Sequence, residues 1–245
     1  MKLMLPDGNT DFNGAGAMLL VDKPLEWTSL DVVKKIKSLF HIKTAGHAGT
    51  LDPKASGLLI ICTGRKTKNI EEFVGLEKHY EGSFQLGVRT ASFDSETDAT
   101  EVKSVEGITP VSISVAMRAF VGKQSQIPPM YSAAKMGGKP LYKYARSGKT
   151  VPRMAKDVEI QFFEPVRIEI PVVEFRVACS KGTYVRSLVD DVGQKLGCGA
   201  YLTFLRRTCI GEYRVEDAAT VEELTTLARE LRIKRFSKYE AGVPA

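Results

Sequence analysis

The chain has 245 residues, of which 43% are hydrophobic and 26% are charged. This composition is typical of a globular protein, and it excludes collagen-like, low-complexity and wholly disordered chains. The longest apolar run, residues 57–62, has the length of a strand and falls far short of the roughly 20 residues that a membrane span needs. The sequence therefore predicts one large domain or two small ones, with no need of a disulfide or metal to build a core.

The cysteines and the amino terminus indicate a cytoplasmic protein. Cys62, Cys179, Cys198 and Cys209 lie far apart and form no C-x-x-C pair. Such spacing suits reduced thiols in the cytosol. Residues 1–14 hold no apolar signal-peptide core, so we expect no export.

The positive charge is concentrated in one stretch. The chain has 35 lysines and arginines against 29 acidic residues, which gives a net charge of +6. Residues 107–156 contain three tyrosines but no acidic residue. Cations bind phosphates and aromatic faces stack on unpaired bases, so this acid-free stretch predicts contact with single-stranded or looped RNA. The alternative is a solvated basic loop without a ligand. Its basic residues are Arg118, Lys123, Lys135, Lys139, Lys143, Arg146, Lys149, Arg153 and Lys156.

The amino-terminal third places short strands and helices around one glycine-rich loop. Residues 1–16 are polar and glycine-rich, and we expect a flexible terminus there. Ser29 is positioned to cap a helix with apolar residues at helical spacing. Glycines and a proline punctuate residues 46–57 and predict a shaped loop. Strands are expected over 17–22, 57–63 and 79–86, and helices over 29–40 and 66–73.

The later elements mix strands and helices without a regular alternation. One helix begins at Thr109, and its apolar residues are Val111, Val115, Met117 and Phe120. Thr220 and Glu223 can form a capping box for the last helix. This order predicts an α+β fold around a mainly antiparallel sheet. Strands are expected over 160–163, 172–179 and 200–209, and the other helices over 182–197 and 221–231.

Several common kinds of site are absent from the sequence. It contains no phosphate-binding G-x-x-x-x-G-K-[ST] loop, no dinucleotide fingerprint and no G-x-S-x-G nucleophile elbow. The three histidines, His41, His47 and His79, lack a metal-ligand spacing, and no cysteine pair completes a set. The motifs of zinc deaminases are missing as well. We therefore expect chemistry on ordinary side chains, without a metal.

The glycine-punctuated segment is the best candidate site. It presents His47, Thr50 and Asp52 on backbone shaped by glycines and Pro53. An Asp-Pro pair can equally be a turn in which the carboxylate only caps amides. A carboxylate that acts as a nucleophile needs a partner that keeps it ionised. Arg186, in the first turn of a helix, can grip a carboxylate in a fork, although the pattern alone does not show that it meets Asp52.

These segments resemble the tRNA pseudouridine synthase B (TruB) family along almost the whole chain. The aspartate motif alone would be only suggestive, but so many blocks in one order at compatible spacing are specific. The matching blocks are LLVDKP (Leu19–Pro24), GHAGTLDPKASGLLIICTGRKTK (Gly46–Lys68), KHYEGSFQLGVRTASFDSETD (Lys78–Asp98), QIPPMYSAAKMGGKPLYKYARSGKTVPR (Gln126–Arg153), CSKGTYVRSLVDDVGQKLGCGAYLTFLRR (Cys179–Arg207) and GEYRVEDA (Gly211–Ala218).

The resemblance implies a reaction. The family isomerises a uridine in the T-arm of tRNA, at position 55 of tRNA, to pseudouridine. The N1–C1′ glycosidic bond is cut, the uracil turns, and the base is rejoined through C5. The resemblance also implies an α+β core around a mostly antiparallel sheet, no cofactor or metal, and extrusion of the uridine before reaction, since a stacked base cannot be reached.

The resemblance assigns catalytic roles to three residues. Asp52 aligns with the catalytic aspartate, which would add to C1′ or assist the departure of uracil through a glycal route. Arg186 would hold Asp52 ionised. Tyr80 matches the active-site tyrosine that packs on the flipped base and takes part in proton transfer.

Four further positions are implied as substrate contacts. Tyr184 and Leu205 align with the pocket wall. His47 matches a histidine that contacts the RNA near the flipped site, and Lys23 matches a lysine beside the cleft. Each has a structural alternative: Tyr80 and Leu205 could be core residues, His47 a hydrogen-bonded loop residue and Lys23 a structural or surface residue.

The resemblance also implies a domain organisation. Residues 17–231 would form the pseudouridine synthase catalytic domain, and its RNA-gripping insertion, at about 124–153, falls within the acid-free stretch. Many family members continue into an RNA-binding PUA domain. Residues 232–245 would form only a basic tail, so we expect a weaker grip on the acceptor arm. Ala48 stands where relatives usually carry threonine, which removes one hydroxyl contact.

We therefore expect a monomeric cytoplasmic enzyme that acts on tRNA without a cofactor and without a membrane. The alternative is a non-catalytic RNA-binding or tRNA-folding module on the same fold, which would not need Asp52, Tyr80 and Arg186 together. A third possibility is the catalytic subunit of a guide-RNA-dependent relative. The expected lack of the C-terminal domain, which those complexes use, argues against it.

Overall fold

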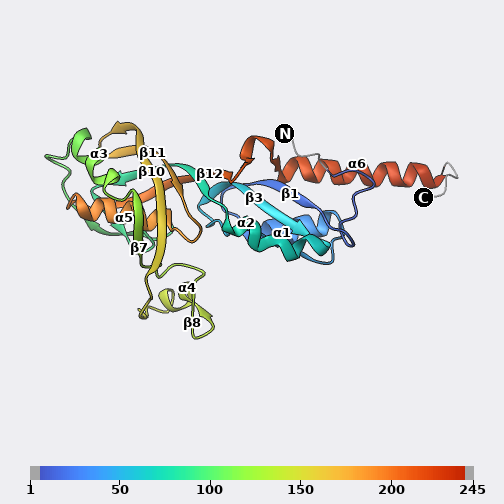
Figure 1. Cartoon of the computed structure of the whole chain (residues 1–245), viewed down its shortest axis with the longest axis horizontal. Coiled ribbons are helices and arrows are strands. Elements are labelled where there is room, and N and C mark those ends of the chain that lie inside the picture. The colour runs from blue at the N-terminus through green and yellow to red at the C-terminus, as the bar shows by residue number, and fades with distance from the viewer. Residues whose placement is uncertain (1–5, 241–245) are drawn as a thin grey trace. The chain divides into compact units, whose positions relative to one another are not determined.

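The computed structural model describes residues 6–240, and only the backbone of residues 234–240. The chain divides into two compact units, whose elements Figure 1 shows. Unit 1 comprises Met1–Leu76 with Arg207–Ala245, and unit 2 comprises Glu77–Arg206. Strand β12 (Ala200–Ile210) begins in unit 2 and ends in unit 1.

Unit 1 is built on two antiparallel strands, β1 and β3, paired from Met18 opposite Cys62 to Lys23 opposite Gly57. β2 is antiparallel to β3, β13 is antiparallel to the end of β12, and β14 is parallel to β1. The elements of unit 1 are β1 (Met18–Lys23), α1 (Ser29–Leu39), β2 (Ala45–His47), β3 (Ala55–Thr63), the 3-10 helix η1 (Gly64–Asn69), α2 (Ile70–Gly75), β13 (Tyr213–Arg214), the 3-10 helix η2 (Val215–Asp217), β14 (Ala219–Thr220) and α6 (Val221–Glu240).

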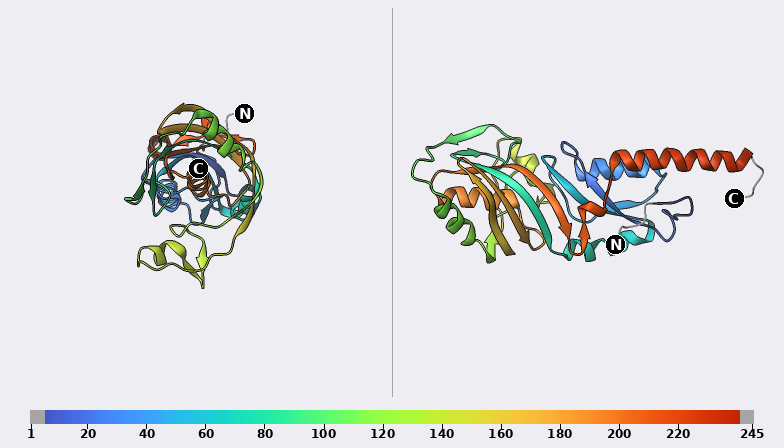
Figure 2. Two further views of the ribbon diagram at one scale, coloured as in Figure 1. Left: turned by 90° about the vertical axis from the view of Figure 1, so that its left-hand side faces the viewer. Right: turned by 90° about the horizontal axis from the view of Figure 1, so that it is seen from above.

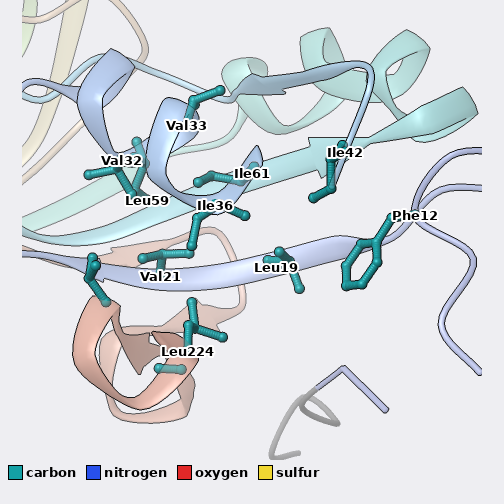
Figure 3. Close-up of a cluster of buried hydrophobic side chains, with 12 residues drawn as sticks. Phe12, Leu19, Val21, Val32, Val33, Ile36, Ile42, Leu59, Ile61 and Leu224 are labelled. Carbon is teal, nitrogen blue, oxygen red and sulfur yellow. The ribbon is translucent and has the colours of Figure 1, made fainter. Parts of the chain in front are cut away.

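Strand β3 forms the centre of the unit 1 core because both of its faces are covered. All of its residues are buried, as its continuous apolar run predicts for a strand packed on both sides. Leu59 and Ile61 join a cluster with α1, β1 and α6, in which Figure 3 shows Val32 and Ile36 of α1 facing the strands. The alternate residues, Leu58, Ile60 and Cys62, join a second cluster that α2 covers. Because β2 pairs with β3, the two strands fix both ends of the loop that joins them.

Part of the expected flexible terminus is packed. Phe12 is buried in the first cluster, and its ring centroid lies 5.0 Å from that of Phe40. The carboxylate of Asp11 accepts hydrogen bonds from the amides of Gly14 and Ala15 at 2.7 and 2.8 Å. These bonds close a turn that brings Phe12 onto the core. The segment is therefore ordered here, although its composition is polar.

The last helix starts as expected and ends later than expected. The amide of Thr220 donates to Glu223 Oε2 at 2.7 Å, and the amide of Glu223 donates to Thr220 Oγ1 at 3.1 Å, so the predicted capping box is confirmed. The helix continues past residue 231 to Glu240, as Figure 2 shows. Residues 232–240 contain neither glycine nor proline, so nothing in the sequence stops the helix there. The side chains of Lys234, Arg235 and Lys238, assigned to the basic tail, lie outside the described residues.

Unit 2 holds a sheet with the strand order β12-β4-β11-β10-β7, in which the pairs β4–β11, β11–β10 and β10–β7 are antiparallel. Together with the single parallel pair of unit 1, this confirms the predicted α+β fold with a mainly antiparallel sheet. The other elements of unit 2 are β4 (Lys78–Leu86), β5 (Val88–Thr90), β6 (Ala99–Val102), α3 (Pro110–Arg118), β7 (Gly122–Gln126), β8 (Lys135–Met136), β9 (Lys139–Pro140), α4 (Leu141–Ala145), β10 (Lys156–Glu169), β11 (Val172–Cys179) and α5 (Val185–Lys195).

Helix α3 buries only part of the apolar set that the sequence predicts. Its cap is Thr109, with Pro110 in the first turn, as the sequence predicts. Val111 and Val115, however, are 73% and 60% exposed, whereas Ile113 and Met117 are fully buried. Two apolar stripes compete on this short helix, and the choice between them depends on packing against β10, which the sequence does not reveal.

All four cysteines are thiols, and Cys62, Cys179 and Cys198 are buried. Burial raises the pKa of the Cys62 thiol to about 11, so it stays protonated and behaves as a small apolar residue. Among residues 6–240, no helix has the length and apolar character needed to cross a membrane.

A buried charge cluster ties α5 to β5. Arg89 donates to both carboxylate oxygens of Asp190, Nε to Oδ1 at 2.8 Å and Nη2 to Oδ2 at 3.0 Å, and Asp190 is 2% exposed. The next residue, Asp191, forms no such fork with any side chain that the structure describes. Burial and the neighbouring Asp190 charge raise the pKa of Asp191 to about 6. Its ionised form is therefore unfavourable in the folded protein.

We expect Asp191→Asn to raise the free energy of unfolding at pH 7 by about 1–2 kcal/mol, after allowance for partial exposure. The folded-state pKa of about 6 exceeds the ordinary value of 3.8, so the folded wild type binds more protons than the unfolded chain between these values. Its stability therefore falls as the pH rises through that window. Urea unfolding at several pH values measures the difference, with exposed Asp157→Asn as the control. A gain as large at pH 4 as at pH 7 would contradict the assignment.

Candidate active site

The loop that carries Asp52 lies between β2 and β3 and is held by backbone hydrogen bonds. The amide of Ala55 donates to the Asp52 carbonyl at 3.0 Å, and the amide of Glu26 donates to the Pro53 carbonyl at 2.8 Å. Lys54 Nζ contacts Glu26 Oε1 at 2.8 Å, which adds a second link to the same segment. The predicted shaped loop is thus a turn fixed at several points, with Asp52 half-buried.

Ser29 has a different role from the expected helix cap. Thr28 is the N-cap of α1, in a capping box with Asp31. The Ser29 hydroxyl is free to reach the loop instead: it accepts from the Leu51 amide at 2.9 Å and donates to the Leu51 carbonyl at 3.2 Å. Two hydrogen bonds therefore hold Leu51, the residue before Asp52, at the start of α1.

Lys23 is a buried amine close to Asp52. It is fully buried, and its Nζ donates to the carbonyls of Pro24 at 2.9 Å and Trp27 at 2.6 Å. Burial lowers the pKa of Lys23 to about 8, although the negative charge of Asp52 acts in the opposite direction. Lys23 thus places a positive charge near Asp52 from within the same unit.

His47 ends β2 and is half-buried. Its Nδ1 is buried and has no hydrogen-bond partner among the residues that the structure describes. Burial, followed by the charge of Arg207, lowers the pKa of His47, so the ring is neutral at pH 7. The next residue, Ala48, is fully buried in the second cluster, where a threonine hydroxyl would require a partner.

In unit 2, Arg186 is the second residue of α5 and is 2% exposed. Its Nη1 donates to the Ser92 carbonyl at 3.2 Å, and its Nε lies 3.9 Å from Asp94 Oδ2. Its Cζ lies 5.8 Å from the ring centroid of Tyr184. The guanidinium that the resemblance pairs with Asp52 therefore has the carboxylate of Asp94 beside it.

The loop around Asp94 is itself tightly bonded. The Ser92 hydroxyl donates to Asp94 Oδ1 at 2.6 Å, and the Glu96 amide donates to the same oxygen at 2.9 Å. Thr90 Oγ1 donates to the Asp94 carbonyl at 2.7 Å, and Phe93 between them adopts a positive φ of 66°. These bonds fix Asp94, whose carboxylate lies beside the Arg186 guanidinium, in the same loop as the Ser92 carbonyl that accepts from it.

Tyr184 is the N-cap residue of α5 and is held through its backbone by Gln126. The Tyr184 amide donates to Gln126 Oε1 at 2.7 Å, and Gln126 Nε2 donates to the Tyr184 carbonyl at 3.1 Å. Because Gln126 is the last residue of β7, this pair ties the start of α5 to the strand that leads into the insertion.

Tyr80 and Leu205 lie on strands and are mostly buried. Tyr80 pairs with Val177 across β4 and β11 and is 8% exposed, and Leu205 of β12 is 7% exposed. Both positions fit a pocket wall and a plain core equally well, as the sequence already allowed.

The acid-free stretch contains a small separate substructure. The hairpin β8–β9 and the helix α4 extend from the sheet of unit 2 beyond β7 and β10, in Figures 1 and 2 alike. Leu141 is its buried anchor, and its amide donates to the Ala134 carbonyl at 2.7 Å. Lys139 lies 4.6 Å from the Tyr144 ring centroid, and Arg146 lies 5.5 Å from that of Tyr142. These cations stack on the tyrosines and cover part of their faces.

The structure brings together the predicted residues of each unit. In unit 1, the negative charge of Asp52 acts on the pKa of Lys23, and His47 ends the strand before the Asp52 loop. In unit 2, Arg186 and Tyr184 are neighbours. The pairing of Asp52 with Arg186 would join the two units and remains a prediction. Among the residues described, no group of His, Cys, Asp and Glu could hold a metal. Three residues that shape the site, Asp94, Gln126 and Arg207, have no role that the sequence pattern predicts, and Ser29 was expected only as a helix cap.

Two family models cover most of the chain. Residues 37–185 match the TruB family pseudouridylate synthase (N terminal domain), and residues 186–235 match the tRNA pseudouridylate synthase B C-terminal domain. The chain belongs to the TruB family. The first TruB match contains Asp52 and Tyr184, and the second begins at Arg186.

Curated TruB relatives are similar over most of their length. The tRNA pseudouridine synthase B of Chloroherpeton thalassium is 48% identical over 214 residues, which cover 85% of this chain and 89% of that protein. The protein of the same name from Burkholderia pseudomallei is 45% identical over 224 residues, which cover 91% of this chain and 74% of the relative.

Solved structures share the fold. The archaeal box H/ACA sRNP Nop10-Cbf5 complex matches with a TM-score of 0.67 and 24% identity, over 97% of this chain and 62% of that chain. A Cbf5-Nop10-Gar1 complex matches with a TM-score of 0.66 and 27% identity, over 90% of this chain and 61% of that chain. The chain therefore spans less than two thirds of these solved chains.

Proposed function

We propose that this TruB family member is a tRNA pseudouridine synthase that isomerises the T-loop uridine at position 55 of tRNA to pseudouridine. The observation that carries the proposal is the family match, which runs through both the Asp52 loop and the Arg186 helix. Relatives that carry the name tRNA pseudouridine synthase B are 45–50% identical over most of the chain.

In the proposed reaction, the Asp52 carboxylate acts at C1′ of an extruded uridine. Either it adds to C1′ as the N1–C1′ bond breaks, or it assists departure of uracil through a glycal. The bonding electrons leave with N1 of uracil. The base turns and C5 bonds to C1′, which breaks the Asp52–C1′ bond on the addition route, or returns to C2′ the proton that Asp52 removed on the glycal route. The C5 proton is then lost while N1 gains one, so the product is an isomer of the substrate. No cofactor is required for this balance.

Arg186 and Lys23 supply the positive charge that the carboxylate needs once substrate excludes water. An arginine stays protonated and can form a fork with a carboxylate. The fixed Asp94 loop orients the Arg186 guanidinium, which supports a role for Asp94 as a positioning residue. Lys23 adds its charge from the base of the Asp52 turn.

The other predicted residues form the proposed substrate contacts. Tyr80 packs on the flipped uracil and assists proton transfer, and Tyr184 and Leu205 form the pocket wall. His47 contacts the RNA near the flipped uridine, and its half-buried ring, which burial keeps neutral, leaves part of its surface exposed. We propose a cytoplasmic monomer that holds the T-arm with the insertion.

The test of the function is tritium release from bare tRNA labelled at uridine C5, followed by mapping of the pseudouridine. The proposal predicts release with multiple turnovers by the purified protein and pseudouridine at position 55. A non-catalytic binding module would bind the tRNA without release. A guide-RNA-dependent subunit would release tritium only after a guide RNA and partner proteins were added.

Basic residues of the insertion are expected to bind the tRNA backbone. Lys135, Lys143 and Lys149 are exposed. Replacing all three by glutamine should weaken tRNA binding about tenfold at moderate salt and reduce the slope of log Kd against log salt by about 2, because released counterions scale with phosphate contacts. Filter binding over a salt series measures both quantities.

The matched control removes three lysines on or just after α1: Lys34, Lys37 and Lys43. It changes the net charge equally, so a non-specific charge effect would appear in both triple variants. The role of the insertion would be refuted by an equal loss of affinity in the two variants.

A further inference from the structure

Every backbone carbonyl in the turn around Asp52 has a hydrogen-bond donor. A buried backbone carbonyl without a donor lowers the stability of the fold, so the donors of these carbonyls show what holds the turn in place. Two of the five carbonyls, those of Gly49 and Thr50, depend on one side chain, that of Arg207. The full set is Gly49 from Arg207 Nη2 at 3.2 Å, Thr50 from Arg207 Nη1 at 3.4 Å, Leu51 from Ser29 Oγ at 3.2 Å, Asp52 from the Ala55 amide at 3.0 Å and Pro53 from the Glu26 amide at 2.8 Å.

Arg207 bridges the backbone before Asp52 and the strand after it. Besides the two loop carbonyls, its Nε donates to the Leu58 carbonyl of β3 at 2.7 Å. The planar guanidinium thus binds both sides of the turn with a fixed fork, a geometry that a lysine ammonium cannot reproduce. All the groups involved lie in unit 1.

The backbone is shaped to bring Arg207 close. Gly57 of β3 has a φ of +103°, and a Cβ at that position would lie 2.3 Å from the Arg207 carbonyl oxygen. Only glycine allows the two strands to run this closely there. From this position the side chain of Arg207 reaches the carbonyls of Gly49 and Thr50 in the loop.

Removing the Arg207 charge from water costs free energy, and filling space in the core would not require a charged residue. Arg207 is 1% exposed, and among the described side chains its bonds go to carbonyl oxygens and not to a carboxylate. A buried charge of this kind is often replaceable by an apolar residue without loss of stability. The positive charge of Arg207 also lowers the pKa of both Lys23 and His47, so it is felt at the residues around Asp52.

We propose that Arg207 is a positioning residue for the isomerisation, which holds the Asp52 turn in its reactive place through the carbonyls of Gly49, Thr50 and Leu58. This inference rests on the proposed function. Arg207 does not touch the substrate in this account. Its effect belongs to the chemical step, because a reacting group displaced by about 1 Å loses roughly 100-fold in rate.

The test compares Arg207→Lys and Arg207→Met with the wild type. Single-turnover tritium release gives the rate of the chemical step, and filter binding gives the Kd for tRNA. We expect the rate to fall about 10-fold in Arg207→Lys and about 100-fold in Arg207→Met, with the Kd nearly unchanged. Exposed Arg214→Met, on β13 of the same unit, is the control and should leave both values unchanged.

A second measurement reads the turn without using activity. Amide hydrogen exchange at Leu51 should be faster in Arg207→Lys than in the wild type, while exchange in the centre of β3 stays slow. An inactive wild type would refute the proposed function but leave this result intact. The inference on Arg207 is overturned by a folded Arg207→Met variant with the wild-type rate, by a loss confined to the Kd, or by loss of folded protein in both variants.

Discussion

Replacing Asp52 by asparagine should reduce isomerisation at least about 1,000-fold, because an amide can neither add to C1′ nor take the C2′ proton that a glycal route must remove. Tritium release from labelled tRNA under single-turnover conditions measures the rate. The Kd for tRNA should stay within about threefold of the wild type, since the change removes one charge of many at the RNA interface.

The structure makes this substitution a sharp test. The bonds that close the turn use the Asp52 carbonyl and neighbouring backbone groups, and asparagine keeps these backbone bonds. Exposed Asp157→Asn is the matched control and should keep full activity. If Asp52→Asn retained more than about a tenth of the wild-type rate, another residue would have to be the nucleophile.

Replacing Arg186 by methionine is expected to lower both activity and stability. The rate should fall about 100-fold or more, because the Asp52 carboxylate loses its guanidinium partner. The free energy of unfolding should fall by about 3 kcal/mol, because the buried Asp94 is left without its cation. Tritium release and urea unfolding measure the two effects.

The double variant Arg186→Met with Asp94→Asn separates the two effects. An asparagine at position 94 can still accept from Ser92 and Glu96 but carries no buried charge. We expect the double variant to recover most of the lost stability and none of the activity. If it recovered activity as well, Arg186 would be only a counter-ion for Asp94 and not a partner of Asp52.

The sequence predicts the elements whose pattern is local. The run GLLIICT gives the buried strand β3, the spacing of Val32, Val33 and Ile36 gives α1, and Thr220 with Glu223 gives the start of α6. The glycines around Asp52 likewise predict a shaped loop, and the structure shows one. These features depend on neighbours in sequence, so a single chain is sufficient to find them.

Features that depend on distant contacts were missed or misplaced. Ser29 looks like a helix cap, but Thr28 takes that role and leaves Ser29 to bind Leu51, 22 residues away. Asp94 and Arg207 lie in segments that match the family, yet nothing in their spacing shows that one faces Arg186 and the other the Gly49 carbonyl.

Strand β10 extends well beyond the predicted residues 160–163. The sequence gives no reason to carry the strand through Pro165, which lies next to a shift in strand register, where a proline is tolerated. The hairpin β8–β9 and α4 were also not predicted, because their pieces are short and only Leu141 is buried among their residues.

The most direct test of the account is the distance between the Asp52 carboxylate and the Arg186 guanidinium in a structure of the protein bound to a tRNA T-arm stem-loop. We predict a carboxylate oxygen within hydrogen-bond distance of a guanidinium nitrogen, about 2.7–2.9 Å, with both groups facing an extruded uridine. A complex in which Arg186 pairs with Asp94 alone and Asp52 points away from the uridine ribose would contradict the account.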